Sequence, residues 1–107
     1  MRKANVFKQG KFVGIIEESP GGYFFRYAEE YLKDKNTKGL IPTMPKDQKV
    51  YHSKTLFPLF KNMLTEGINR TKQENTYQLK KGDDFGLLLK ICKEDTITKI
   101  TIHEVRG

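Results

Sequence analysis

The stretch that decides the fold runs from residue 11 to residue 27 and reads Lys11-Phe12-Val13-Gly14-Ile15-Ile16-Glu17-Glu18-Ser19-Pro20-Gly21-Gly22-Tyr23-Phe24-Phe25-Arg26-Tyr27. It contains two β-prone runs, 11–17 and 23–27, separated by a Pro-Gly-Gly turn signal. In the second run Tyr23, Phe25 and Tyr27 share one face of a pleated strand, while Phe24 and Arg26 share the other. The stretch therefore predicts two adjacent antiparallel strands.

Further strands are expected on either side of this pair. Residues 4–7 form a β-prone run before the turn signal Gln9-Gly10, so the first three runs predict an antiparallel meander. The tail, residues 96–105, is rich in β-branched residues and is expected to join the same sheet. Ile97 and Ile100 cannot share a face of a regular strand, which predicts a bulge near Thr98-Lys99.

Helical patterns lie between the meander and the tail. Residues 28–34 predict a short helix or one long turn, and residues 68–78 predict a weakly amphipathic helix. Leu56, Phe57, Phe60, Met63 and Leu64 form an apolar stripe, with Thr55 as the expected N-cap and Pro58 at the third helical position. Phe85, Leu88, Leu89 and Cys92 form another, capped by Asp83 or Asp84. Residues 36–52 are expected to be extended segment and loop. The prediction is an α+β fold, a small antiparallel sheet packed with three to four helices.

Length and composition narrow the functional classes. The 107 residues suit one domain, 1–107, and the formal net charge of +7 is spread over single lysines without a polybasic tract. The sequence has no apolar run long enough for a signal peptide or a membrane span, and it has one cysteine, so a cytoplasmic location is expected. His52, His103 and Cys92 do not have metal-ligand spacing, so neither a metal nor a cofactor is expected.

One triplet resembles a catalytic motif. Asp84-Phe85-Gly86 matches the magnesium-binding triplet of protein kinases. It opens an amphipathic helix, and neither a glycine-rich loop nor a strand lysine precedes it. We therefore interpret it as a helix start and expect the chain to have no catalytic activity.

Candidate interface residues lie around the Phe57 helix. Tyr51 and His52 precede it in a lysine-bearing loop, where they are either interface anchors or, for Tyr51, a cap on the edge of the core. Glu66, Asn69 and Arg70 follow it, where local hydrogen bonding is an alternative to partner contact.

The order of these features resembles the N-terminal subdomain of HipA-type toxin kinases. The resemblance covers nearly the whole chain, and its most specific part is the run Leu56-Phe57-Pro58-Leu59-Phe60-Lys61-Asn62-Met63-Leu64-Thr65-Glu66-Gly67-Ile68-Asn69-Arg70. The chain departs from the usual family pattern at residues 39–45 and at Thr98-Lys99.

The resemblance implies a partner. In full-length HipA proteins this subdomain adjoins a Ser/Thr kinase. In HipBST-type systems a small HipS-like protein neutralises a HipT-like kinase toxin, and a HipB-like helix-turn-helix protein accompanies them. We therefore expect an antitoxin whose kinase-facing residues are Tyr51, His52, Phe57, Glu66, Asn69 and Arg70.

Two other functions stay open at the level of sequence. The chain could be an activating or structural subunit that completes a split HipA-type kinase. Alternatively it could be a small basic nucleic-acid-binding protein, although no basic stripe or recognition helix is evident in the sequence.

Overall fold

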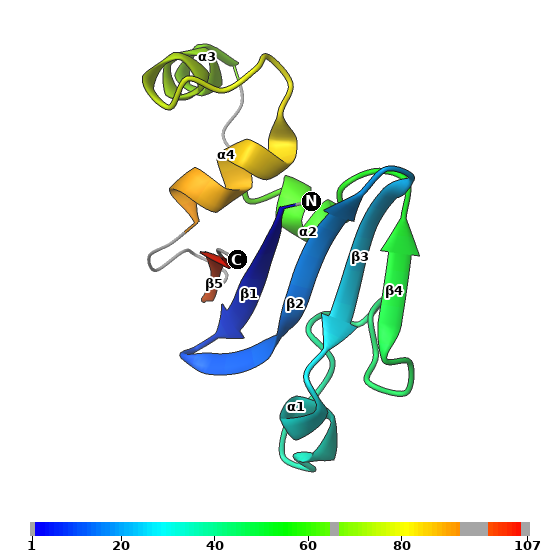
Figure 1. The fold of residues 1–107 in the computed structure, drawn as a ribbon. Helices are drawn as coiled ribbons and strands as arrows, with labels where there is room; N and C mark the ends of the chain where they lie inside the picture. The colour runs from blue at the N-terminus through cyan, green and yellow to red at the C-terminus, as the bar shows by residue number, and fades with distance from the viewer. Residues whose placement is uncertain (1, 65–66, 93–98, 106–107) are drawn as a thin grey trace.

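The computed structural model describes residues 2–64, 67–92 and 99–105 of the chain. Their main feature is a five-stranded antiparallel sheet in the order β4-β3-β2-β1-β5 (Figure 1). The strands are β1 (Lys3–Lys8), β2 (Lys11–Ser19), β3 (Gly22–Tyr27), β4 (Val50–Ser53) and β5 (Ile100–Val105). The sheet confirms the predicted meander and the pairing of the tail with it, since β5 lies beside β1.

The turn between β1 and β2 has the left-handed backbone conformation that suits its sequence. Gln9 and Gly10, between β1 and β2, have φ values of 51° and 81°, the left-handed pair that suits a two-residue hairpin turn. The β1–β2 register shifts between Val6 and Phe7. Of the bulge predicted at Thr98-Lys99, Thr98 lies outside the described residues, and Lys99 has a φ of 63°.

Two predictions made for residues 36–64 were wrong. The end of the supposed loop is β4, which pairs with β3 and places Tyr51 opposite Phe25 and His52 opposite Phe24. The helix α2 (Pro58–Lys61) begins later than expected, with Phe57 as its N-cap instead of Thr55. Proline occupies the first helical position, where no N–H partner is needed. The apolar stripe still faces inward, since Leu56, Phe57, Phe60 and Leu64 are buried.

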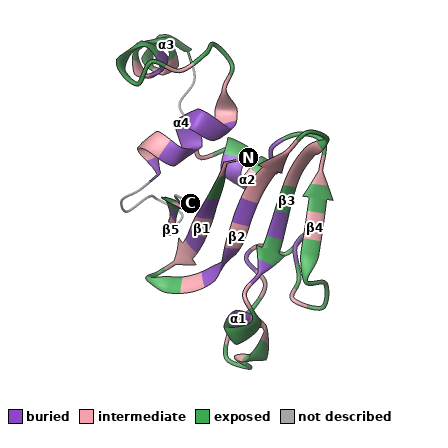
Figure 2. Cartoon of the chain, in the orientation of Figure 1, coloured by how far each residue is buried: buried purple, intermediate pink, exposed green. Residues whose placement is uncertain are grey.

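The core lies between one face of the sheet and the helices. Phe25 and Tyr27 of β3 are buried, and the Phe25 ring is 6.2 Å from that of Phe60 in α2. The remaining helices are α1 (Glu29–Lys33), α3 (Gly67–Thr76) and α4 (Asp84–Ile91). α1 lies at the opposite end of the sheet from α3 and α4 (Figure 1). Buried and exposed bands alternate along β3 in Figure 2, so one face of this strand belongs to the core and the other does not.

Candidate docking surface

The sheet face that points away from the helices carries apolar and aromatic side chains. Phe24 lies beside His52 across the β3–β4 pair, with ring centroids 4.6 Å apart, and Arg26 lies beside Val50. Phe24 and Val50 are 38% and 42% exposed. The neighbouring strand β2 adds Ile15, which lies opposite Arg26.

The side of this face that β1 and β5 form also carries aromatic side chains. Phe7 of β1 packs 5.6 Å from Phe12 and 5.4 Å from the exposed His103 of β5, as measured between ring centroids. Two hollows lie on the face, one of about 140 Å³ that includes Ile15 and Phe24, and one of about 320 Å³ that includes Phe7 and His103. We call this surface the open face and define it by Phe7, Ile15, Phe24, Val50, His52 and His103. Exposed aromatic side chains gathered on one surface are typical of a protein-docking site.

Two of the predicted interface residues are neighbours in β4 and therefore point to opposite sides. His52 is exposed and belongs to the open face. Tyr51 is half buried on the helix side, where its hydroxyl donates to the Pro45 carbonyl at 2.6 Å and its ring lies 6.4 Å from that of Tyr27. Tyr51 therefore covers the edge of the core.

The structure does not bring the other predicted interface residues together with His52. Phe57 is buried in the core, and Asn69 is exposed on α3. Glu66 lies outside the described residues. Arg70 is engaged locally, because its Nη2 donates to Asp84 Oδ1 at 2.6 Å and its Nε to Glu74 Oε2 at 3.3 Å. The Asp84 carboxylate raises the pKa of Arg70, and the pair links α3 to α4.

The kinase-like triplet is a helix start, as predicted. Asp83 is the N-cap of α4, and its Oδ1 accepts from the backbone N–H of Gly86 at 3.0 Å. Asp84 accepts from Arg70. Both carboxylates of this segment are therefore engaged in holding the helix in place.

Cys92 is buried, and the potential metal ligands of the described ranges are not clustered. Burial raises the pKa of the Cys92 thiol to about 11, so the thiolate is disfavoured at neutral pH. Residues 2–64, 67–92 and 99–105 contain no group of three His, Cys, Asp or Glu side chains that could hold a metal ion. Within the same ranges no helix is long and apolar enough to cross a membrane.

These features define a small α+β domain in which helices cover one face of the sheet and leave the other face open. The family model described as the HipA N-terminal domain matches residues 4–102, and the chain belongs to this family. The match is to the N-terminal domain and not to a kinase catalytic domain. The fold agrees with a solved N-terminal domain of HipA toxin, with a TM-score of 0.74 and 24% identity over 100% of this chain and 95% of that one.

Two curated relatives differ in length. An uncharacterized protein of Haemophilus influenzae is 32% identical over 89 residues, which is 83% of this chain and 80% of that protein. A putative kinase of Sinorhizobium fredii, Y4mE, is 29% identical over 82% of this chain but only 21% of its own length. The chain therefore spans most of one relative and about a fifth of the other.

The sequence reasoning missed the open face as a unit. The signal was present in the alternation of β3, which assigned Phe24 and Arg26 to the face opposite Tyr23, Phe25 and Tyr27. The alternation in β3 did not show which residues of the other strands share that face. The segment of β4 was interpreted as loop, and the register of β1, β2 and β5 was unknown.

Proposed function

We propose that this chain is a HipS-like antitoxin that binds and neutralises a HipT-type Ser/Thr kinase toxin in the cytoplasm and has no catalytic activity of its own. Residues 1–107 act as a single HipA N-terminal-like domain. The observation that carries the proposal is the family match over residues 4–102, taken together with the two relatives. Such a domain makes up about a fifth of a putative kinase and most of a short protein. A domain that adjoins a kinase in one chain is suited to dock on a kinase from another.

We assign the docking to the open face and expect Phe24 and His52, on its β3–β4 side, to be the main anchors. Half-exposed aromatic side chains provide contact area with little loss of side-chain entropy, and Arg26 provides a cation beside them. Neutralisation needs only tighter binding to an inactive state of the kinase than to its active state. Of the predicted interface residues that the structure describes, His52 and Asn69 are exposed and remain candidate contacts. A HipB-like DNA-binding protein would join on another surface.

Co-expression with a HipT-type kinase from the same genome tests the function. The wild-type chain should restore growth, and the variants Phe24→Asp and His52→Asp should fail to restore it while remaining folded. Lys81→Asp, an exposed substitution between α3 and α4, is the matched control and should restore growth. Growth that is restored equally by all variants would overturn the assignment to the open face.

A second candidate function is an activating or structural subunit of a split kinase. The Sinorhizobium fredii relative favours it, because the domain there is part of one putative kinase chain. The two functions predict opposite effects on the activity of the kinase. An activator would increase phosphorylation by the kinase and would deepen growth arrest, while an antitoxin would reduce both.

A further inference from the structure

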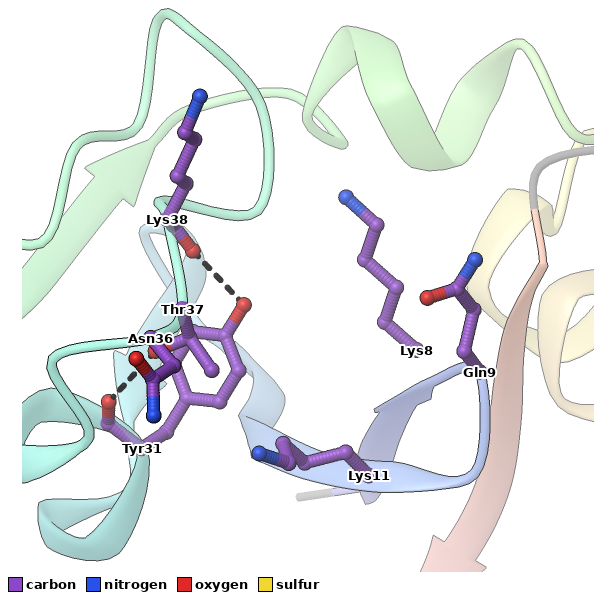
Figure 3. Close-up of a pocket in the computed structure, with 7 residues that line it drawn as sticks. All are labelled: Lys8, Gln9, Lys11, Tyr31, Asn36, Thr37 and Lys38. Carbon is purple, nitrogen blue, oxygen red and sulfur yellow. Dashed lines mark hydrogen bonds between the residues drawn. The ribbon is translucent and has the colours of Figure 1, made fainter.

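A separate pocket lies at the β1–β2 turn, on the side of Tyr31 and the segment that follows α1. It has a volume of about 420 Å³, and Lys8, Gln9 and Lys11 line it on the hairpin side. Tyr31, Asn36, Thr37 and Lys38 line it on the side of α1 and the segment that follows. Figure 3 shows Lys8 and Lys11 extending from the hairpin toward Tyr31 and residues 36–38.

The lining carries more positive than negative charge. Lys11 Nζ pairs with Asp34 Oδ2 at 2.6 Å, so this lysine is neutralised within the described structure. Lys8 Nζ makes only a long contact of 3.5 Å with the Leu40 carbonyl, and Lys38 has no ion pair among the described residues. Lys8 and Lys38 are therefore not neutralised by an ion pair within the described structure.

The wall that faces the hairpin is already ordered. Tyr31 donates its hydroxyl hydrogen to the Lys38 carbonyl at 2.7 Å, and Thr37 Oγ1 donates to the Tyr31 carbonyl at 3.1 Å. Lys46 Nζ donates to Thr37 Oγ1 at 2.6 Å and lies 5.1 Å from the centre of the Tyr31 ring. Because these bonds fix the segment before any ligand arrives, binding there would cost little ordering entropy.

The chemistry of the lining favours a phosphate-bearing ligand. Lysines provide compact positive charges that bind phosphate, and the side-chain amides of Gln9 and Asn36 add neutral hydrogen-bond donors. No arginine lines the pocket, so the planar two-point recognition of a carboxylate is not built into it. The Tyr31 ring stacks on Tyr27 and is covered by Lys46, so it does not offer a free face to a nucleobase.

We propose that this pocket binds the polyphosphate group of a small molecule. Its volume falls within the usual range for small-ligand sites, about 300 to 1,000 Å³, and exceeds what a single phosphate needs. The net charge of +7 would steer such an anion toward the chain. The proposal does not depend on the kinase docking, which uses the opposite face of the sheet.

The test is a titration of the folded chain, monitored by amide chemical shifts, with inorganic tripolyphosphate, adenosine triphosphate, adenosine and a single-stranded oligonucleotide. We expect tripolyphosphate and adenosine triphosphate to bind with similar affinity and to shift residues 8–11 and 36–38. Adenosine should not bind. If adenosine triphosphate alone binds, or if affinity grows with oligonucleotide length, the pocket recognises a base or a nucleic-acid backbone and the proposal is wrong.

Two double variants distinguish binding in this pocket from a general electrostatic attraction of anions to a basic protein. Lys8→Gln/Lys38→Gln should weaken tripolyphosphate binding at least about tenfold, since charge-assisted hydrogen bonds are lost. Lys72→Gln/Lys81→Gln removes the same charge from exposed lysines elsewhere and should change the affinity less than about twofold. Equal losses in the two double variants, or no binding by the wild-type chain, would overturn the proposal. Thermal unfolding of each variant checks that the fold is retained.

Discussion

Arg2, just before β1, donates two hydrogen bonds to the carboxylate of Asp83, the N-cap of α4, although the two residues are 81 positions apart in the chain. The distances are 3.0 Å from Nη1 to Oδ2 and 2.9 Å from Nη2 to Oδ1. The same guanidinium binds Glu18 of β2, with Nε 2.5 Å from Oε1. Arg2 therefore ties the start of the sheet to the start of α4.

The first prediction concerns this clamp. Arg2→Gln should lower the free energy of unfolding at pH 7 by about 1–2 kcal/mol, an amount limited by solvent screening because the guanidinium is partly exposed. Chemical denaturation of the variant and of the exposed Lys3→Gln control measures the difference. Equal stability of the two variants would contradict the role of Arg2.

The clamp also predicts a dependence on pH. Hydrogen bonds from Arg2 lower the pKa of both Glu18 and Asp83 in the folded chain. Their contribution to stability is therefore present above the unfolded-state pKa values of about 4 and is lost as the pH falls through the lower folded-state values. Wild-type stability should decrease over this acid range, and Arg2→Gln should show a smaller decrease. Parallel pH profiles for the two chains would contradict the account.

Gly86 in α4 should not tolerate alanine. A Cβ at this position would lie 2.3 Å from Asp83 Oδ2 and 2.8 Å from Arg2 Nη1, so the N-cap and the clamp would both have to shift. Alanine normally stabilises a helix interior relative to glycine by about 1 kcal/mol, whereas Gly86→Ala should destabilise by about 1–3 kcal/mol. Thermal unfolding measures the sign. Gly21→Ala, with open space around its Cβ, is the control and should change stability by less than about 0.5 kcal/mol.

Tyr27 should be essential for the loop between α1 and β4. Its buried hydroxyl donates to the Met44 carbonyl and accepts from the Leu40 N–H at 2.8 Å. Tyr27→Phe leaves both backbone groups without this partner and should cost about 1–3 kcal/mol in unfolding free energy. Tyr51→Phe removes a more exposed hydrogen bond, to Pro45, and should cost less. A larger loss for Tyr51→Phe would show that the hydroxyl of Tyr27 does not organise this loop.

Cys92 should be inert while the chain is folded. Its side chain is buried, and desolvation raises the pKa of the thiol to about 11. A disulfide reagent at pH 8 should therefore modify no thiol in the native chain and one thiol after denaturation in guanidinium. Rapid modification of the native chain would contradict the buried position.

The local patterns of the sequence were sufficient for most of the fold. The turn at Gln9-Gly10, the apolar stripe of α4 and its Asp83 cap are properties of neighbouring residues, and the structure confirms them. β4 was missed because four residues, Val50 to Ser53, become a strand through pairing with β3, which is remote in sequence. The Arg2–Asp83 clamp was invisible for the same reason, since Arg2 resembles any basic N-terminal residue until the sheet is assembled.

The candidate site was less accessible to sequence reasoning. Closeness in the chain grouped Tyr51, His52 and Phe57 into one expected interface, but strand alternation sends the first two to opposite faces and the helix start at Pro58 buries the third. Only the register between strands reveals that Phe24 and His52 are adjacent. A surface of a sheet is therefore defined by pairing, which a single sequence does not specify.

The most direct test of the central claim is a calorimetric titration of the purified chain into a HipT-type kinase from the same genome, with phosphorylation by the kinase measured in the same samples. We predict a defined complex and reduced phosphorylation, with affinity lowered at least about thirtyfold by Phe24→Asp/His52→Asp, since a lost interface anchor costs 2 kcal/mol or more. Lys35→Asp/Lys81→Asp, at exposed positions outside α3, should bind as the wild type does. The absence of a complex, together with unchanged phosphorylation, would contradict the claim that this chain is a kinase-neutralising domain.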